Sequence, residues 1–331
     1  MTHLAAPQHM VTRFAPSPTG LLHVGHGWSA LMAMDMARAA GGAFRLRIED
    51  IDGTRSRPEH VAGILADLTW LGVAWDGEVM FQSQRLDRYD AALDRLRSEG
   101  LLYPCFCTRA DIQASLTAPH GPEGPVYPGT CRGLSEGERE RRISAGEAHA
   151  WRIDMGRAVE RVGMLIWSAL PFPVRAEPVE ASSSSSNKDG PLRRRLRRRS
   201  GQASTSSGRT VQIAAAPHTH GDVVLARKDA PASYHLSCTL DDAAMGVTHV
   251  LRGDDLFTAT HVHRLIQALL DLPSPAYVHH PLLLGADGRR LAKRDGAIAL
   301  ADLRRDGMDP AVLAADLRAG RFPIGISIAS A

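Results

Sequence analysis

The stretch Arg13-Phe14-Ala15-Pro16-Ser17-Pro18-Thr19-Gly20-Leu21-Leu22-His23-Val24-Gly25-His26 decides the fold of this 331-residue chain. Its central prolines and glycine exclude regular structure, so a strand should end before them and a tight turn should follow. Apolar residues then recur at helical spacing as far as Gly41-Gly42, at Trp28, Leu31, Met32, Met36 and Ala39. The stretch therefore predicts a strand, a turn, and a helix that begins with two histidines.

The start of that helix is a candidate anion site, because unpaired N–H groups and the positive end of the helix dipole meet there. His23 and His26 would add hydrogen-bond donors, and Gly25 leaves room for a ligand to approach the backbone. Two histidines with a purely structural role in a tight loop are the alternative. These residues alone leave that choice open.

The composition is that of an ordinary globular protein, with 44% hydrophobic and 23% charged residues. A net charge of +3 permits RNA binding but does not indicate it. No apolar run has the length of a membrane span, and residues 1–10 lack a signal-peptide pattern. With only four cysteines, a disulfide framework is not expected. We therefore expect a cytoplasmic protein with no membrane partner.

An acidic residue follows the next predicted strand. Phe44, Leu46 and Ile48 alternate with polar residues, which predicts a strand with one face in a core. Glu49 then lies at the carboxyl end, where open α/β sheets bind ligands, and it could hold an ammonium group. A solvated acidic loop is the alternative. Helical patterns follow at 58–72 and 84–99, so the alternation predicts a doubly wound α/β fold.

Three cysteines suggest a metal site. Cys105 and Cys107 form a C-x-C pair, and Cys131 follows in a loop rich in proline and glycine. Tetrahedral zinc would need a fourth ligand, for which His120 is a candidate, whereas three buried thiols are the alternative. The fourth cysteine, Cys238, falls in an apolar, strand-like segment and is expected to be a core thiol.

Residues 172–220 differ in composition from the rest. They contain serine runs and an arginine-rich run at 193–199, with almost no periodic apolar pattern, so we expect disorder. The arginine run could be an RNA-binding arm. We favour instead a dispensable insertion, which resembles the translated product of a mobile palindromic repeat.

Order should return at Gly221. Tyr234 and Arg252 lie near predicted strand ends, and Lys293 lies in a basic, glycine-rich loop from which it could reach nucleotide phosphates. A short helix is expected at 310–317, and no structure is predicted for 322–331. Four histidines of this half are expected either to be structural or to support the residues that contact a ligand, namely His261, His263, His279 and His280.

Two motifs together resemble those of a known family. Residues 13–26 resemble the HIGH-type motif of class I aminoacyl-tRNA synthetases of the glutamyl and glutaminyl type, and residues 291–294 resemble the KMSKS-type motif. Arg290 and Ala292 depart from the wider synthetase pattern but leave Lys293 in place. The resemblance implies a Rossmann-type catalytic domain over 10–104 and 221–320. It also implies an inserted zinc-binding subdomain over 105–171, followed by the insertion at 172–220.

The family resemblance also implies a chemistry. ATP would activate L-glutamate to glutamyl-adenylate, with Mg²⁺ accompanying the ATP and one structural Zn²⁺ in the subdomain. The implied ATP-binding and catalytic residues are His23, Gly25, His26 and Lys293. The implied glutamate pocket comprises Arg13, Phe14, Ala15, Pro16, Ser17, Glu49, Tyr234 and Arg252. The implied zinc ligands are Cys105, Cys107, Tyr127 and Cys131.

The expected RNA partner follows from the same resemblance. About forty residues follow the second motif, so the chain is most similar to a shortened branch of the family without an anticodon-binding domain. That branch attaches glutamate to queuosine at the wobble position of tRNA(Asp), and we expect a monomer with that RNA as its partner. The alternatives are a truncated enzyme charging tRNA(Glu) and an inactive nucleotide- or RNA-binding remnant.

Overall fold

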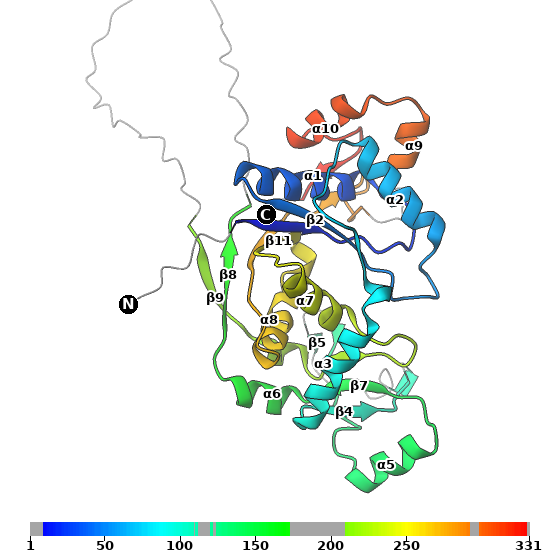
Figure 1. Ribbon diagram of the computed structural model, residues 1–331, viewed down its shortest axis with the longest axis vertical. Helices are drawn as coiled ribbons and strands as arrows, with labels where there is room; N and C mark the ends of the chain where they lie inside the picture. Colours follow the sequence, from blue (N-terminus) through cyan, green and yellow to red (C-terminus); the bar gives the residue numbers. More distant parts are fainter. Residues whose placement is uncertain are drawn as a thin grey trace, which may run out of the picture.

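The computed structural model describes residues 9–108, 110–111, 120–121, 124–172, 209–291 and 298–329. Parallel strands occupy the centre of the molecule, where β1 lies beside β11 (Figure 1). The Thr248 N–H, directly before β11, donates to the Val11 carbonyl oxygen at 3.0 Å. One group of strands has the order β1 (Val11–Phe14), β2 (Ala43–Ile48), β3 (Met80–Phe81). The other has the order β11 (His249–Gly253), β12 (Ala276–His280), β8 (Ile166–Leu170), β9 (Val211–Ala214), in which only β9 is antiparallel to its neighbour.

Helices cover both faces of these strands (Figure 1). One face carries α1 (Val24–Ala39), α2 (Pro58–Trp70), α9 (Leu300–Arg305) and α10 (Pro310–Arg318). The other carries α7 (Tyr234–Ala244) and α8 (Ala259–Leu269). A Cβ atom at Gly27 of α1 would lie 2.8 Å from a methyl carbon of Leu71, so glycine permits this close packing. The doubly wound α/β fold expected from the sequence is confirmed. No described helix is both long enough and apolar enough to cross a membrane.

A smaller antiparallel sheet makes the lower part of the molecule (Figure 1), with the strand order β10, β7, β4. Its strands are β4 (Leu102–Cys105), β7 (Ala150–Ile153) and β10 (Val224–Ala226), and its surroundings include α3 (Leu86–Ser98), α5 (Glu136–Ser144) and α6 (Met155–Val162). Two short strands belong to the same region, β5 (His120–Gly121) and β6 (Gly124–Pro125). The structure groups two strands differently from the domain ranges expected from the sequence. Strand β8, placed by sequence in the subdomain, joins the central strands, and β10, placed in the catalytic half, joins the small sheet.

The segment expected to be disordered is partly ordered. Of residues 172–220, residues 173–208 lie outside the described residues, but Val211–Ala214 form β9 and Pro217–His220 form a 3₁₀ turn. Strand β9 pairs with β8 in an antiparallel register that places Val211 opposite Ala169. The two chain ends that flank residues 173–208 therefore meet at one end of a β-hairpin.

This hairpin predicts the outcome of a deletion. Removing residues 176–207 should leave β8 and β9 intact, so aminoacylation should stay within about threefold of the full chain, because loop length affects stability only weakly. A matched deletion of 176–215 also removes β9 and the hydrogen bond from the Ala215 N–H to the Leu165 carbonyl, and it should lower the melting temperature. A tenfold loss of activity in the shorter deletion would show that the segment contributes to function.

Two further segments differ from expectation. Cys238 lies in helix α7 rather than in a strand, although it is buried as predicted. Ser327–Ile328 form β14, which pairs with β13 (Leu283–Leu284), so the last described residues are part of the fold. The ring of Phe322 also packs edge-on against Trp28. The C-terminal segment thus supports the helix that carries the two motif histidines.

Candidate active site

A pocket of about 180 Å³ opens at the N-terminus of α1. His23, Gly25 and His26 line it together with Phe14 and the first residue of the second motif, Leu291. The first turn of α1 contains no acidic residue, so its N–H groups and dipole favour an anion. The two motifs recognised in the sequence therefore meet at one pocket.

The two histidines have defined hydrogen-bond roles. Nδ1 of His23 accepts from the Gly25 N–H, and Nδ1 of His26 accepts from the His23 N–H, each at 3.1 Å. The rings stack with centroids 3.7 Å apart. In the neutral form each ring carries its proton on Nε2, which makes that atom a donor for a phosphate oxygen. A Cβ at Gly25 would lie 3.1 Å from Cε1 of His23, so a larger residue would press on this ring.

The second motif is anchored on both sides. Leu291 lines the pocket, and the Val24 N–H donates to the Ile298 carbonyl at 3.2 Å. The Leu300 N–H donates to the Leu22 carbonyl at 2.8 Å. Lys293 itself lies outside the described residues, but the chain enters and leaves its segment beside the start of α1.

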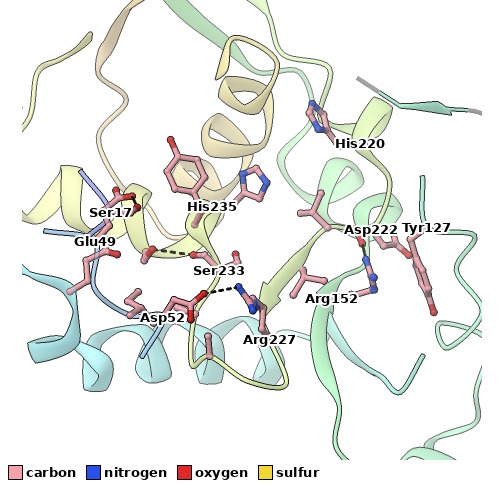
Figure 2. Close-up of a pocket in the computed structure, with 18 of the residues that line it drawn as sticks. Ser17, Glu49, Asp52, Tyr127, Arg152, His220, Asp222, Arg227, Ser233 and His235 are labelled. Atoms are coloured by element: carbon pink, nitrogen blue, oxygen red, sulfur yellow. Dashed lines mark hydrogen bonds and ion pairs between the residues drawn. The ribbon is translucent and has the colours of Figure 1, made fainter. Parts of the chain in front are cut away.

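A larger cleft of about 590 Å³ lies between the catalytic strands and the small sheet. Figure 2 shows Ser17 and Glu49 on one side of it and Tyr127, Arg152 and Asp222 on the other. Tyr234 also lines the cleft, and Ser17 Oγ lies 3.5 Å from Glu49 Oε2. Of the expected glutamate-pocket residues, Ser17, Glu49 and Tyr234 therefore line this cleft. Phe14 lines the neighbouring pocket at the start of α1.

Arg252 is the most informative of the expected residues. Its side chain is buried, with 5% of the residue exposed, and it donates only to neutral acceptors. No described carboxylate lies within 4.0 Å of it, unlike most buried charges, which are paired. These acceptors are His279 Nε2, Tyr234 Oη, His263 Nδ1, the Leu256 carbonyl and Thr260 Oγ1, at 2.6–3.4 Å. The site thus holds a buried cation that a ligand carboxylate would neutralise.

Arg13 differs from Arg252 because it already has an anionic partner. Asp242 Oδ1 accepts from Arg13 Nε at 3.1 Å and from Arg47 Nη1 at 2.6 Å. Arg47 Nη2 in turn donates to Glu49 Oε1 at 3.0 Å. One carboxylate on α7 therefore fixes two arginines, and through Arg47 it fixes the orientation of Glu49.

The pKa values of the carboxylates reflect these partners. Burial raises the pKa of Glu49, and Arg47 only partly offsets this effect. Burial would also raise the pKa of Asp242, but Arg13 and Arg47 together outweigh it and hold that pKa below its usual value. Asp242 therefore stays negatively charged within the network. Glu49 lines the cleft, and its pKa is raised from the usual value.

The expected zinc ligands lie together in the small subdomain. The sulfur atoms of Cys105, Cys107 and Cys131 are all within 4.8 Å of one another. The hydroxyl oxygen of Tyr127 lies 3.4 Å from Cys105 Sγ and 3.5 Å from Cys107 Sγ. Zn–S bonds of about 2.3 Å in a tetrahedron give sulfur spacings of roughly 3.8 Å, so the donor set fits Zn²⁺. The side chain of His120, the alternative ligand, lies outside what the structure describes.

The sequence matches the family described as tRNA synthetases class I (E and Q), catalytic domain, over residues 9–165 and 175–324. The chain belongs to this family. It is 45% identical over 307 residues to a "Glutamyl-Q tRNA(Asp) synthetase" from Rhodobacter capsulatus, covering 91% of this chain and 97% of that protein. It is 35% identical to a "Glutamate--tRNA ligase" from Oleidesulfovibrio alaskensis, over 92% of this chain and 55% of that protein.

Solved structures agree with this assignment. A glutamate–tRNA synthetase from Elizabethkingia anophelis superposes with a TM-score of 0.63 at 25% identity, covering 87% of this chain and 53% of that one. This class I synthetase is therefore an ATP-dependent ligase of the glutamate–tRNA type, with an amino acid, ATP and a tRNA as substrates.

Sequence reasoning missed some residues of this synthetase site. Arg47 belongs to the polar set of its strand, yet it is fully buried, because α7 covers that face and supplies Asp242. His235 and His220 also line the cleft. The only sequence signal for the Arg47 network was the pair Asp241-Asp242, whose position opposite β2 depends on the tertiary fold.

Zinc removal has a predictable effect in this synthetase. The chain as purified should contain about one zinc per molecule, and Cys131→Ala should lower that content and the melting temperature, since the site ties two loops together. Because Tyr127 also lines the cleft, glutamate transfer should fall more than adenylate formation. Cys238→Ala is the matched control, since this buried thiol lies outside the cluster. Full zinc content in Cys131→Ala would contradict the assignment.

Proposed function

We propose that the chain activates L-glutamate with ATP and transfers it to queuosine in tRNA(Asp). Five relatives named glutamyl-Q tRNA(Asp) synthetase, 38–45% identical, support the choice of RNA. The observation that carries the choice of amino acid is the buried, uncompensated Arg252. A ligand carboxylate would supply the missing negative charge, and glutamate, the amino acid in the relatives' names, offers two carboxylates.

Glutamate would bind between the two halves of the cleft. Arg252 takes one carboxylate, with the Tyr234 hydroxyl 3.4 Å from its Nη1 atom available to the same group. Glu49 and Ser17 hold the ammonium group, and Arg47 keeps Glu49 in position. Arg13, whose charge is shared with Asp242, is buried and also donates to the Leu251 carbonyl at 3.2 Å, and it is proposed to act in the pocket together with Ala15 and Pro16. Pro16 offers a second link, because its carbonyl accepts the Glu49 N–H at 3.0 Å.

Activation needs positioning and charge stabilisation rather than a protein nucleophile. The glutamate carboxylate attacks the α-phosphorus of ATP, and pyrophosphate leaves. His23 and His26 donate from Nε2 to phosphate oxygens at the start of α1, where the helix dipole also stabilises the charge. Lys293 would approach the outer phosphates from the loop between Leu291 and Ile298, and Mg²⁺ would arrive bound to the ATP. The zinc held by Cys105, Cys107, Tyr127 and Cys131 would shape the opposite wall of the cleft.

In the second step a hydroxyl of the RNA attacks the glutamyl carbonyl carbon, and AMP leaves. In queuosine that hydroxyl belongs to the cyclopentenediol. The cleft of about 590 Å³ is large enough for a nucleoside beside a bound amino acid. Its far wall, formed by Tyr127, Arg152 and Asp222, offers an aromatic surface and charged groups to such a ligand.

The decisive experiment separates the two half-reactions. Glutamate-dependent ATP–pyrophosphate exchange is measured without RNA, and labelled glutamate is then offered to tRNA(Asp) with queuosine, tRNA(Asp) without it, and tRNA(Glu). We expect exchange with glutamate and label on queuosine-containing tRNA(Asp) alone. Label on tRNA(Glu) would overturn the RNA assignment, and no exchange with glutamate would overturn the amino-acid assignment.

A further inference from the structure

A chain of hydrogen bonds runs from the buried arginine to the cleft through two histidines. Nη1 of Arg252 lies 3.2 Å from Nδ1 of His263. Nε2 of His263 lies 3.2 Å from Nδ1 of His235. His263 is buried, with 2% exposed, whereas His235 is partly exposed and lines the cleft.

The direction of this chain follows from the chemistry of arginine, which has only N–H donors. Because Arg252 must donate to His263, Nδ1 of His263 must be the acceptor, and its proton then lies on Nε2. That N–H donates onward to Nδ1 of His235. The reverse direction would place a donor of His263 against a donor of Arg252 at 3.2 Å.

The second histidine is thereby restricted to one tautomer. Since Nδ1 of His235 accepts from His263, the neutral ring carries its proton on Nε2. No described residue accepts that proton through a hydrogen bond, and the ring belongs to the wall of the cleft (Figure 2). Burial, together with the positive charges of nearby His220 and Arg252, lowers the pKa of His235 to about 4, so the neutral form dominates near pH 7.

The other groups packed against these rings do not reverse the direction. Cys238 Sγ lies 3.6 Å from His263 Nε2 and can share the same proton as a weak acceptor. The Tyr234 ring contacts His263 edge-on and His235 at a tilt. No described carboxylate bonds to either imidazole, so no anion stabilises a protonated form.

We propose that His235 is a substrate-binding residue of the transfer step, whose Nε2–H donates to an oxygen of the vicinal diol of the acceptor nucleoside. His263 is its positioning residue. Because His263 accepts from Arg252 at Nδ1, it donates from Nε2 to Nδ1 of His235, which leaves the proton of His235 on Nε2. This assignment rests on the proposed function, which supplies the acyl transfer. The vicinal diol that His235 would bind occurs both in the cyclopentenediol of queuosine and in a ribose. The contact would hold one hydroxyl of the diol while the other attacks the glutamyl carbonyl.

The first test reads the tautomer directly. Nitrogen-15 NMR of the histidine-labelled full chain should show His235 protonated at Nε2 and unprotonated at Nδ1 at pH 7, with assignment from His235→Gln. Adding queuosine nucleoside should shift the His235 Nε2 resonance. A proton on Nδ1 of His235, or no shift with the nucleoside at saturating concentration, would overturn the proposal.

The second test is kinetic and uses a matched pair of variants. His235→Phe removes the donor but keeps a ring, whereas His235→Gln restores an amide donor. We expect His235→Phe to lower glutamate transfer at least tenfold more than it lowers ATP–pyrophosphate exchange, with the glutamine variant recovering much of the loss. Equal losses in both half-reactions would instead assign His235 to glutamate binding and overturn the proposal.

These readouts distinguish the inference from the proposed function. Transfer is measured on whichever of queuosine-containing tRNA(Asp) and tRNA(Glu) accepts glutamate, so a change of RNA leaves the comparison valid. If neither RNA accepts glutamate, the proposed function fails, and the NMR experiment alone decides the role of His235.

Discussion

Replacing Arg252 with methionine should nearly abolish glutamate-dependent ATP–pyrophosphate exchange while leaving the fold intact. Arg252 is buried and has no carboxylate partner among the described residues, so its positive charge lacks the counter-charge that a substrate carboxylate would supply. Losing one partner of a buried, hydrogen-bonded charge pair costs about 2–5 kcal/mol, which corresponds to a roughly 30-fold to several-thousand-fold loss in kcat/KM for glutamate.

The expected effect of Arg252→Met on stability is small. Removing an uncompensated buried charge relieves a desolvation cost, which opposes the cost of leaving all five acceptors of Arg252 without this donor. The melting temperature should therefore change by only a few degrees. Exchange activity close to that of the unmodified chain would contradict the assignment of Arg252 to the substrate carboxylate. A large fall in melting temperature would show that its role is structural.

The sequence predicted the elements that local patterns specify. The prolines and Gly20 gave the turn before α1, and the residue alternation around Phe44 gave β2. The sequence pattern placed Glu49 and Arg252 at strand ends. They became candidate ligand contacts because open α/β sheets bind ligands beyond the carboxyl ends of their strands. The four expected zinc ligands were brought together as the family resemblance implied.

The parts that sequence reasoning missed depend on long-range pairing. Strand β8 was expected in the subdomain but pairs with β12 of the central strands, and β10 was expected in the catalytic half but pairs with β7 of the small sheet. Both partners are distant in the chain. Ser327–Ile328 gain their structure only by pairing with β13. Alternation placed only one face of β2 in a core, whereas a helix nearly two hundred residues later covers the polar face as well. Alternation predicts which residues share a face but not what covers that face.

Replacing Arg47 with methionine should strongly lower the stability of the fold, whereas Arg252→Met should change it little. The reason is that Arg47 neutralises two carboxylates, which remain in the variant. Its guanidinium bonds to Asp242 at 2.6 Å and to Glu49 at 3.0 Å, and the residue is fully buried. Breaking a buried pair by removing one partner costs about 3–5 kcal/mol of stability. The melting temperature should fall on the order of 10 °C, as measured by calorimetry beside Arg252→Met.

The same variant should also change the pH dependence of stability. The pKa of Asp242 is held below its usual value in the folded chain, so its contribution is present above the unfolded pKa of about 3.9 and is lost as the pH falls through the lower, folded pKa. Without Arg47 the folded pKa of Asp242 rises, and the acid-induced loss should begin at a higher pH. If Arg47→Met melts no lower than Arg252→Met, then Asp242 and Glu49 do not depend on Arg47. The distinction between an arginine that stabilises the fold and one that awaits substrate would then be wrong.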